Sequence, residues 1–238
     1  MPETWSEIMR DAANGVTGKY HIERDDGRVE TLEVSDYIQP VSEWSEIEQI
    51  AIKHAKGKVL DIGCGAGRVA LYLQILGHDV VGIDLAPGAI EASRIMGVGR
   101  AYVMSASDLH FKDDVFDTVV LFGNNFGVAG DEDHIVKMLR QLHGITTPDA
   151  IILAGTLDPL NTEDSSHLEY QKKNRERNRP PGLVRIRVKY KDLVGEWSDL
   201  WLVTPDEMKL LAKKAGWQLE KTIQIDGVSQ YVGILTKS

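Results

Sequence analysis

Apolar residues recur with two different periods along the chain, and the alternation between these periods predicts the secondary structure. Short, mostly apolar runs at 59–62, 80–83, 101–104, 116–122 and 150–154 are typical of parallel strands buried on both faces. In three of the four segments between these runs, apolar residues return every three or four positions, as in helices with one buried face, whereas the segment between 104 and 116 is expected to be a loop. Strands that alternate with helices predict a parallel sheet with right-handed crossovers, which is a doubly wound α/β fold.

The helix predicted after the strand at 59–62 follows a glycine-rich turn and ends at Gly77, because glycine commonly terminates helices. Residues 147–149, Thr-Pro-Asp, are predicted to form the turn that precedes the fifth strand. The inward face of the first helix is expected to carry Val69, Tyr72, Leu73 and Leu76.

The first 55 residues follow a different pattern, and we expect them to form a cap segment beside the sheet. A short helix is predicted up to about residue 14, followed by alternating runs at 19–24 and 28–34. Asp-Gly between two such runs is a strong hairpin signal. A second helix is predicted over 41–55, with one face formed by Trp44, Ile47, Ile50 and Ala51.

The alternation of strands and helices breaks after the fifth strand. Residues 157–203 contain a polar helical stretch and two alternating runs, at 183–190 and 197–203, which predict an inserted helix and antiparallel hairpin. A helix with a capping box starts at Thr204, and two last strands meet at an Asp-Gly turn. The prediction is one domain over residues 1–238, with a mostly parallel seven-stranded sheet that ends in an antiparallel hairpin.

The residues around the first turn indicate the kind of ligand it holds. Gly63, Gly65 and Gly67 permit a tight turn and let a ligand approach bare backbone at the end of a strand. A dinucleotide fingerprint needs a small residue where Arg68 stands, because the helix and strand pack closely there. Asp61, before the turn, suits a ligand with a cationic end better than a pyrophosphate.

Residues 59–68 resemble the first motif of the class I S-adenosylmethionine-dependent methyltransferases, and the resemblance extends over about 41–155 and 204–238. The chain as a whole looks most like the small-molecule members from bacteria and archaea. The resemblance implies a Rossmann-like fold, S-adenosyl-L-methionine as cofactor and S-adenosyl-L-homocysteine as product. It also implies methyl transfer to a small-molecule acceptor, with the segments 1–55 and 157–203 forming the walls and lid of the acceptor pocket.

The same resemblance implies roles for acids that follow the next two strands. Asp84 stands about 20 residues after the glycine turn, where a carboxylate binds the ribose hydroxyls in nucleotide folds. Asp108 matches the acid that accepts from the adenine amine. The alternatives are a solvated aspartate at the strand end for Asp84 and a loop-capping aspartate for Asp108. The expected cofactor-binding residues are Asp61, Gly63, Cys64, Gly65, Arg68, Asp84, Leu85, Ser107, Asp108, Leu109, Phe122, Gly123 and Asn124. Arg68 could reach the cofactor carboxylate, and pairing with a surface acid is its alternative role.

The acceptor is expected beyond the carboxyl ends of the strands. Arg185 and Arg187 lie on one face of the inserted hairpin and could bind an acidic group, although a solvated hairpin face has the same pattern. No catalytic residue is identified, because His21, His110, His134 and Asp158 stand singly near loops. The expected acceptor-binding residues are Tyr20, Tyr37, Trp44, Asn125, Arg185, Arg187 and Tyr190, although aromatic residues at such positions are usually core.

Composition and charge argue against several other classes of function. The net charge of −9 argues against a nucleic-acid partner, and no apolar run approaches the ~20 residues that span a bilayer. The single cysteine excludes an intrachain disulfide and a cysteine-clustered zinc site, and no metal is expected. The acidic N-terminus lacks an apolar signal core, so a cytoplasmic location is expected. The protein is expected to be a monomer or a homodimer.

Three alternatives remain open at this point. The same fold could act on protein or RNA, with the basic residues between 172 and 189 as the docking surface. It could also bind S-adenosylmethionine without catalysis. A nicotinamide dehydrogenase is the third, and Arg68 weighs against it.

Overall fold

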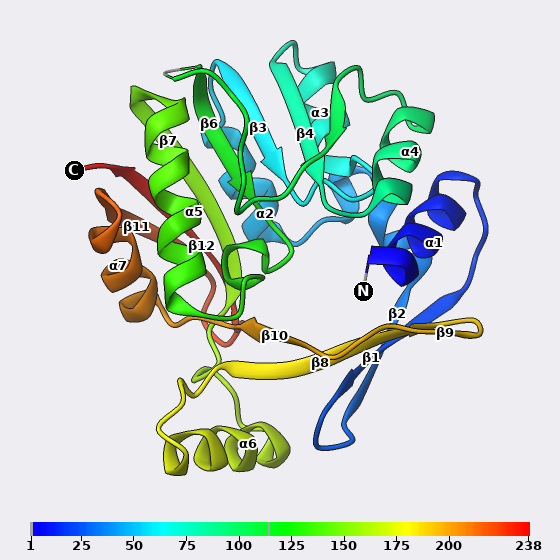
Figure 1. Cartoon of the computed structure of the whole chain (residues 1–238), viewed down its shortest axis with the longest axis vertical. Coiled ribbons are helices and arrows are strands. Elements are labelled where there is room, and N and C mark those ends of the chain that lie inside the picture. Colours follow the sequence, from blue (N-terminus) through cyan, green and yellow to red (C-terminus); the bar gives the residue numbers. More distant parts are fainter. Residues whose placement is uncertain (1, 114) are drawn as a thin grey trace.

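The structure, a computed structural model, describes residues 2–113 and 115–238 and contains two sheets (Figure 1). The larger sheet has seven strands in the order β11-β12-β7-β6-β3-β4-β5. Strands β3 to β7 run parallel, and β12 and β11 add antiparallel at one edge, which confirms the predicted architecture. The bounds are β3 Lys58–Ile62, β4 Asp79–Asp84, β5 Ala101–Val103, β6 Phe116–Leu121, β7 Thr146–Leu157, β11 Trp217–Gln224 and β12 Gln230–Lys237.

Helices cover both faces of this sheet because the side chains of each strand alternate between two apolar clusters. Val119 and Leu121 pack with α5 (Glu132–Ile145) and α7 (Pro205–Lys214), whereas Val120 packs with the helices on the opposite face. Those helices are α2 (Glu46–Ala51), α3 (Arg68–Ile75) and α4 (Pro87–Ile95). The carboxyl ends of the parallel strands therefore form one edge of a three-layer domain.

The smaller sheet joins the two hairpins that the sequence predicts separately. Its order is β10-β8-β1-β2, and β1 pairs antiparallel with β8, for example Ile22 with Val188. Figure 1 shows this sheet crossing below the larger one, with α6 (Ser165–Glu176) beyond it. Its strands are β1 Lys19–Arg24, β2 Val29–Glu33, β8 Leu183–Tyr190, β9 Leu193–Val194 beside β8, and β10 Ser198–Trp201.

Helix α1 (Pro2–Ala13) connects the smaller sheet to the larger domain. On one side, Ser6 accepts a hydrogen bond from the Gly88 amide of α4. On the other side, the Tyr190 hydroxyl at the end of β8 donates to Asp11 over 2.6 Å, and Lys191 pairs with Asp11 over 2.6 Å. The cap segment and the inserted hairpin are thus one connected unit.

Two predicted helix faces are wrong in part. The helix over 41–55 is divided into a 3₁₀ turn at Val41–Glu43, the helix α2 and a second 3₁₀ turn at Ile52–His54. Ser45 caps α2 by accepting a hydrogen bond from the Glu48 amide. Because α2 starts anew at this cap, its buried face does not include Ile50, which is 38% exposed. Leu76 is 57% exposed because α3 ends at Ile75.

The predicted turn at residues 147–149 is also wrong, because β7 starts at Thr146 and runs through it. The Lys237 ammonium group, at the end of β12, donates to the Thr146 carbonyl over 2.6 Å. Thr147 donates to Asp117 of β6, and the register with β6 shifts between Phe116 and Thr118. This irregularity accommodates the proline, which has no N–H for a regular ladder.

Candidate functional site

The glycine turn lies where β3 enters α3, and each glycine in it has a left-handed backbone. The φ angles of Gly63, Gly65 and Gly67 are 69°, 55° and 91°. A Cβ atom added at Gly63 would lie 2.2 Å from the Asn125 side-chain nitrogen, which donates to the Gly63 carbonyl and to the Ile62 carbonyl. Glycine is therefore required here by conformation and by close approach.

Four amide groups of this turn, those of Gly63, Cys64, Gly65 and Gly67, donate within the protein. Gly63 and Cys64 both donate to the Ile83 carbonyl, at 2.8 and 3.0 Å, and Gly67 donates to the Cys64 carbonyl. The Gly65 amide donates to the Asp84 carboxylate over 3.1 Å. These four N–H groups are unavailable to a phosphate, which is the ligand that free amides at a helix N-terminus bind. The geometry agrees with the sequence argument against a dinucleotide.

Asp61 is a buried acid with an unsatisfied oxygen at the end of β3. Its residue is 3% exposed, and its Oδ2 atom has no hydrogen-bond partner among the described residues. Burial raises the pKa of Asp61 to about 7, while the Arg68 guanidinium and the Ala70 amide favour the charged form and Asp84 opposes it. A cationic ligand group would satisfy this carboxylate.

Arg68 occupies the start of α3, within electrostatic reach of Asp61. Its two terminal nitrogens donate to both carboxylate oxygens of Glu48 on α2, at 3.0 Å. The guanidinium carbon also lies 4.6 Å from the ring centre of Trp44. Trp44 is 5% exposed and its ring packs on the Arg68 guanidinium, and its place in the acceptor wall stays a prediction.

Asp84 ends β4 and links the glycine turn to the start of α4. Its carboxylate accepts from the Gly65 amide and, at 2.8 Å, from the Ala86 amide. Burial raises the pKa of Asp84, and these backbone N–H groups work in the opposite direction. Leu85 beside it is 59% exposed, so an apolar side chain stands open next to the proposed ribose position.

The loop after β5 contains the three residues of the predicted adenine contact. Gln141 on α5 holds this loop from both sides, since it accepts from the Leu109 amide at 2.8 Å and donates to the Ser107 carbonyl at 2.9 Å. Asp108 is exposed and lies 3.2 Å from a ring nitrogen of His110. The loop connects to the site through the Met104 amide, which donates to the Asp84 carbonyl.

The end of β6 completes the rim of the site. Phe122 is buried, Gly123 is exposed, and Asn124 has a left-handed φ of 67° before the 3₁₀ turn η4 (Asn125–Gly127). Asn125, whose predicted contact with the acceptor stays a prediction, uses its amide nitrogen to connect η4 to the glycine turn. The two hydrogen bonds that the Asn125 side chain donates therefore help to hold the glycine turn in place.

The cap segment covers the glycine turn. A Cβ atom added at Gly65 would lie 3.3 Å from the Met9 methyl and 3.7 Å from the Tyr37 ring. The Tyr37 and Tyr20 hydroxyls are 2.8 Å apart, and burial raises the pKa of both. The Tyr37 ring therefore lies next to the glycine turn. Tyr20 contacts Tyr37 on the side away from the turn and is 3% exposed.

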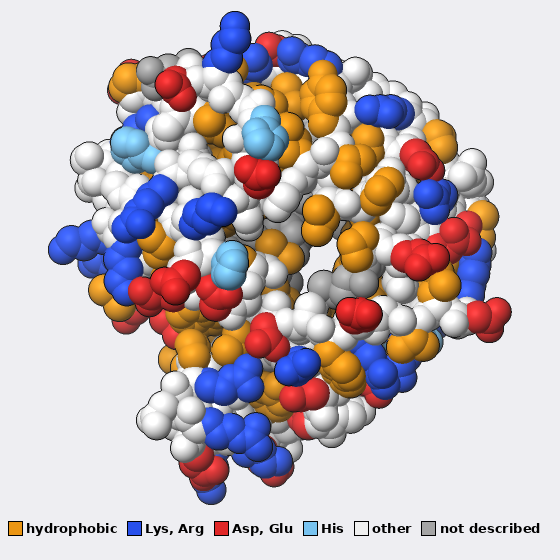
Figure 2. Space-filling model, in the orientation of Figure 1, with side chains coloured by type: hydrophobic (Ala, Val, Ile, Leu, Met, Phe, Trp, Pro, Cys, Tyr) orange, Lys and Arg blue, Asp and Glu red, His pale blue; other side chains and the backbone are white. Residues whose placement is uncertain are grey.

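The remaining predicted acceptor-binding residues, Arg185, Arg187 and Tyr190, lie on β8 of the smaller sheet. Figure 2 shows the surface hollowed near its centre, between the regions that Figure 1 identifies as the two sheets. Arg185 lines a cavity of 270 Å³ with Trp197 and the segment 129–131 that follows η4. Arg187 is paired with Glu23 at 2.5 Å, and Tyr190 is turned toward α1.

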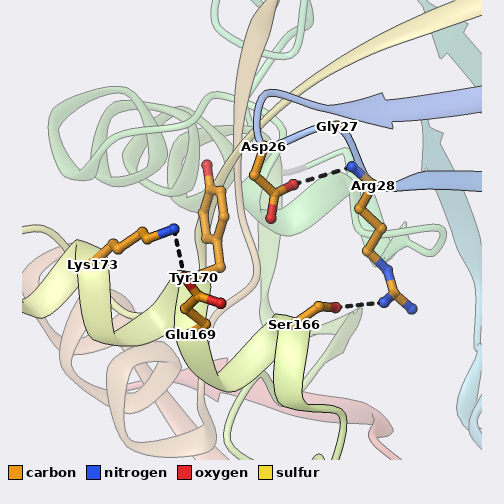
Figure 3. Close-up of a pocket in the computed structure, with 7 residues that line it drawn as sticks. All are labelled: Asp26, Gly27, Arg28, Ser166, Glu169, Tyr170 and Lys173. Atoms are coloured by element: carbon orange, nitrogen blue, oxygen red, sulfur yellow. Dashed lines mark hydrogen bonds and ion pairs between the residues drawn. The ribbon is translucent and has the colours of Figure 1, made fainter.

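A second cavity, of 510 Å³, lies between the β1–β2 turn and α6 (Figure 3). Its charged side chains all have protein partners: Arg28 pairs with Asp164, and Lys173 pairs with Glu169 at 2.8 Å. Asp26 is bound by Arg24. The residues that line this cavity come from the β1–β2 turn and from α6, and none belongs to the glycine turn. This cavity is therefore not the candidate site.

The lone histidines have local partners. The His21 ring lies 2.9 Å from the Thr31 hydroxyl, and the His134 ring lies 2.7 Å from Asp131. Within residues 2–113 and 115–238, no group of three or more His, Cys, Asp or Glu is placed to hold a metal ion. In the same part of the chain, no helix is both long enough and apolar enough to cross a membrane.

Sequence reasoning missed two polar residues that shape the site. Glu48 lies on the buried face of α2 with Ile47 and Ala51, and Trp44, just before the helix, precedes Glu48 by four residues. A charge within an apolar stripe indicates a buried partner, so this signal was present. Gln141 lies on α5 and gave no such signal, because glutamine is common on helix surfaces.

Comparison with known proteins agrees with the fold. Residues 59–149 match the model of a family described as a methyltransferase domain. A crystal structure of an S-adenosylmethionine-dependent methyltransferase from Bacteroides fragilis, in complex with S-adenosyl-L-homocysteine, matches with a TM-score of 0.82. That match covers 98% of this chain and 94% of that chain at 22% identity. Residues 59–149 thus match a methyltransferase domain family, and the chain as a whole has the fold of a known S-adenosylmethionine-dependent methyltransferase.

Two curated relatives match over part of their length. Malonyl-[acyl-carrier protein] O-methyltransferase of Yersinia pestis is 29% identical over 109 residues, which are 46% of this chain and 40% of that protein. Ubiquinone biosynthesis O-methyltransferase of Ruegeria sp. is 24% identical over 165 residues, which are 67% of this chain and 59% of that protein. The chain thus spans less than two thirds of the length of either relative.

Proposed function

We propose that this protein transfers the methyl group of S-adenosyl-L-methionine to a small-molecule acceptor. The observation that carries the proposal is the unsatisfied buried carboxylate of Asp61 beside a turn in which four amides already have acceptors within the protein. Such a site fits the ammonium group of an amino-acid-like ligand and does not fit a pyrophosphate. The relatives named as O-methyltransferases support the reaction class.

Different residues around the turn would contact different parts of the cofactor. Asp61 and Arg68 would hold the charged methionine end, and Asp84 would accept from the ribose hydroxyls. Leu85 and the loop containing Ser107, Asp108 and Leu109 would contact the adenine. Gly123 and Asn124, at the end of β6, would lie near the reactive centre.

The chemistry makes few demands on protein side chains. The bound sulfonium supplies an electrophilic methyl group, so the protein must orient a nucleophile about 3 Å from it and exclude water. The smaller sheet and α1, which close over the carboxyl edge, support that role. We keep Arg185 and the cavity that it lines as the proposed acceptor subsite.

Calorimetry and turnover test the proposal together. We expect S-adenosyl-L-homocysteine and S-adenosyl-L-methionine to bind, and NAD not to bind. A broad acceptor panel, followed by release of S-adenosyl-L-homocysteine, then measures catalysis. Tight NAD binding without S-adenosyl-L-methionine binding would overturn the assignment, and binding without turnover would favour a non-catalytic module.

Cofactor affinity is expected to rise with pH, because a cationic ligand binds the ionised form of Asp61. With the pKa of Asp61 raised to about 7 in the free protein, affinity should increase about tenfold from pH 6 to pH 8. Calorimetry of S-adenosyl-L-homocysteine in phosphate and in Tris would also detect proton release near neutrality.

The matched control is Asp61→Asn, whose affinity should be lower and free of this rise. A raised carboxyl pKa means that the folded state binds more protons, so stability falls as pH rises toward 7. The variant should therefore lose less thermal stability than the wild type between pH 5 and pH 8. A pH-independent affinity in the wild type would contradict the role of Asp61.

A macromolecular acceptor is the second candidate, and the surface of α6 favours it. The stretch from Lys172 to Arg179 contains five cations and one acid, and Lys172, Arg175 and Arg177 are exposed. If this surface docks RNA, heparin and poly-U should bind with an affinity that falls steeply with salt. Absence of salt-sensitive binding would remove this candidate, and Lys172→Gln with Arg175→Gln is the matched variant.

A further inference from the structure

Glu48 is a buried acid outside the sequence motifs described above, and it binds Arg68, the residue that directly follows the glycine turn. It is 5% exposed and comes from α2 in the cap segment, whereas Arg68 begins α3. Both carboxylate oxygens accept from Arg68 at 3.0 Å, which is the paired geometry that fixes a guanidinium plane.

Stability alone does not account for this pair. A buried ion pair is often no more stabilising than apolar side chains of equal volume, since both charges must leave water. The pair also leaves part of Arg68 open: its side chain is 20% exposed, whereas that of Glu48 is 7% exposed. The Nε atom of Arg68 has no hydrogen-bond partner among the described residues.

The position of the pair relates it to the proposed cofactor. Arg68 is close enough to Asp61 to favour its charged form, and close enough to Tyr37 to affect the tyrosine in the same way. Two carboxylates, Glu48 and Asp61, therefore surround one guanidinium. This charge pattern matches a ligand end that carries both an ammonium and a carboxylate group.

We propose that Glu48 is a positioning residue that holds Arg68 in the orientation in which it binds the carboxylate of the cofactor's methionine end. Trp44 supports the same orientation from the guanidinium face. Because Glu48 lies in the cap segment, docking of that segment and recognition of the amino-acid end of the ligand are coupled. This inference rests on the proposed function and assigns a role inside the same site.

The test uses two ligands that differ in the amino-acid end. S-adenosyl-L-homocysteine contains it, and 5′-methylthioadenosine lacks it. In Glu48→Gln, we expect the affinity for S-adenosyl-L-homocysteine to fall about tenfold, with less than a twofold change for 5′-methylthioadenosine. Arg68→Lys should show the same selective loss, because lysine keeps the charge but not the fork of donors.

The double variant separates coupling from two independent effects. If Glu48 acts through Arg68, Glu48→Gln combined with Arg68→Lys should lose little more affinity than either change alone. Glu46→Gln is the matched control, since Glu46 is exposed on the same helix and should leave both affinities unchanged. The KM for S-adenosyl-L-methionine should rise in Glu48→Gln with less effect on kcat.

Three results would overturn the inference. Equal losses for the two ligands would indicate a general effect on the fold, unchanged affinity would show that Arg68 needs no support, and additive losses would show independent action. Failure of the proposed function is a different result: the wild-type protein would then bind neither ligand.

Discussion

Replacing Gly127 with alanine is expected to lower the free energy of unfolding by about 3 kcal/mol and to abolish acceptor turnover. A Cβ atom at Gly127 would lie 1.8 Å from the Trp201 carbonyl oxygen and 2.8 Å from its carbonyl carbon. Because these are backbone atoms, the clash cannot be relieved by a side-chain rotation. The change must separate η4 from β10, and with it the smaller sheet from the carboxyl edge of the larger one.

Urea denaturation and the acceptor assay measure the two parts of this prediction. Gly144→Ala is the matched control, because Gly144 lies in α5 and an added Cβ would meet nothing within 4 Å. Alanine there should leave turnover unchanged and raise stability by up to about 1 kcal/mol. A Gly127→Ala protein as stable and active as the wild type would show that β10 does not pack on η4 during catalysis.

Replacing Asp84 with alanine is expected to weaken cofactor binding by about 1.5–3 kcal/mol, or roughly 10- to 150-fold. The loss has two physical causes. The carboxylate that would accept from the ribose hydroxyls is removed, and the amides of Gly65 and Ala86 lose their acceptor. The glycine turn should therefore become less ordered as well as lose a direct contact.

Calorimetry with S-adenosyl-L-homocysteine measures the effect, and Asp79→Ala provides the comparison. Asp79 starts the same strand at its opposite end, where it pairs with Lys58 and Arg100 on the surface. Its removal should leave cofactor affinity unchanged. Asp84→Asn keeps one acceptor oxygen, so its loss should be intermediate, and an unchanged dissociation constant in Asp84→Ala would refute the ribose role.

Local patterns predicted most of the elements because they depend on neighbours in the chain. The capping box at Thr204 and Glu207 forms as expected, and Asp131 caps α5. Failures occurred where a local signal was weaker than a contact from elsewhere. Pro148 indicated a turn, yet the pairing of β7 with its neighbours extends the strand past it.

The site was predictable to the extent that motif residues face the same edge of the sheet. Asp61 and Asp84 meet the glycine turn because the carboxyl ends of adjacent parallel strands lie together. The role of Asn125 was not predictable in this way. Its side chain reaches the Ile62 carbonyl, 63 residues away, and only the folded chain brings the two together.

The sequence by itself determined the order of strands and helices, the glycine turn and the acids that follow the strands, since these follow from spacing along the chain. Only the tertiary structure decided that the two hairpins form one sheet, and that Arg68 is held by Glu48 of the cap segment. The physical reason is that strand register and ion-pair geometry depend on segments far apart in the chain, whose meeting no local periodicity encodes.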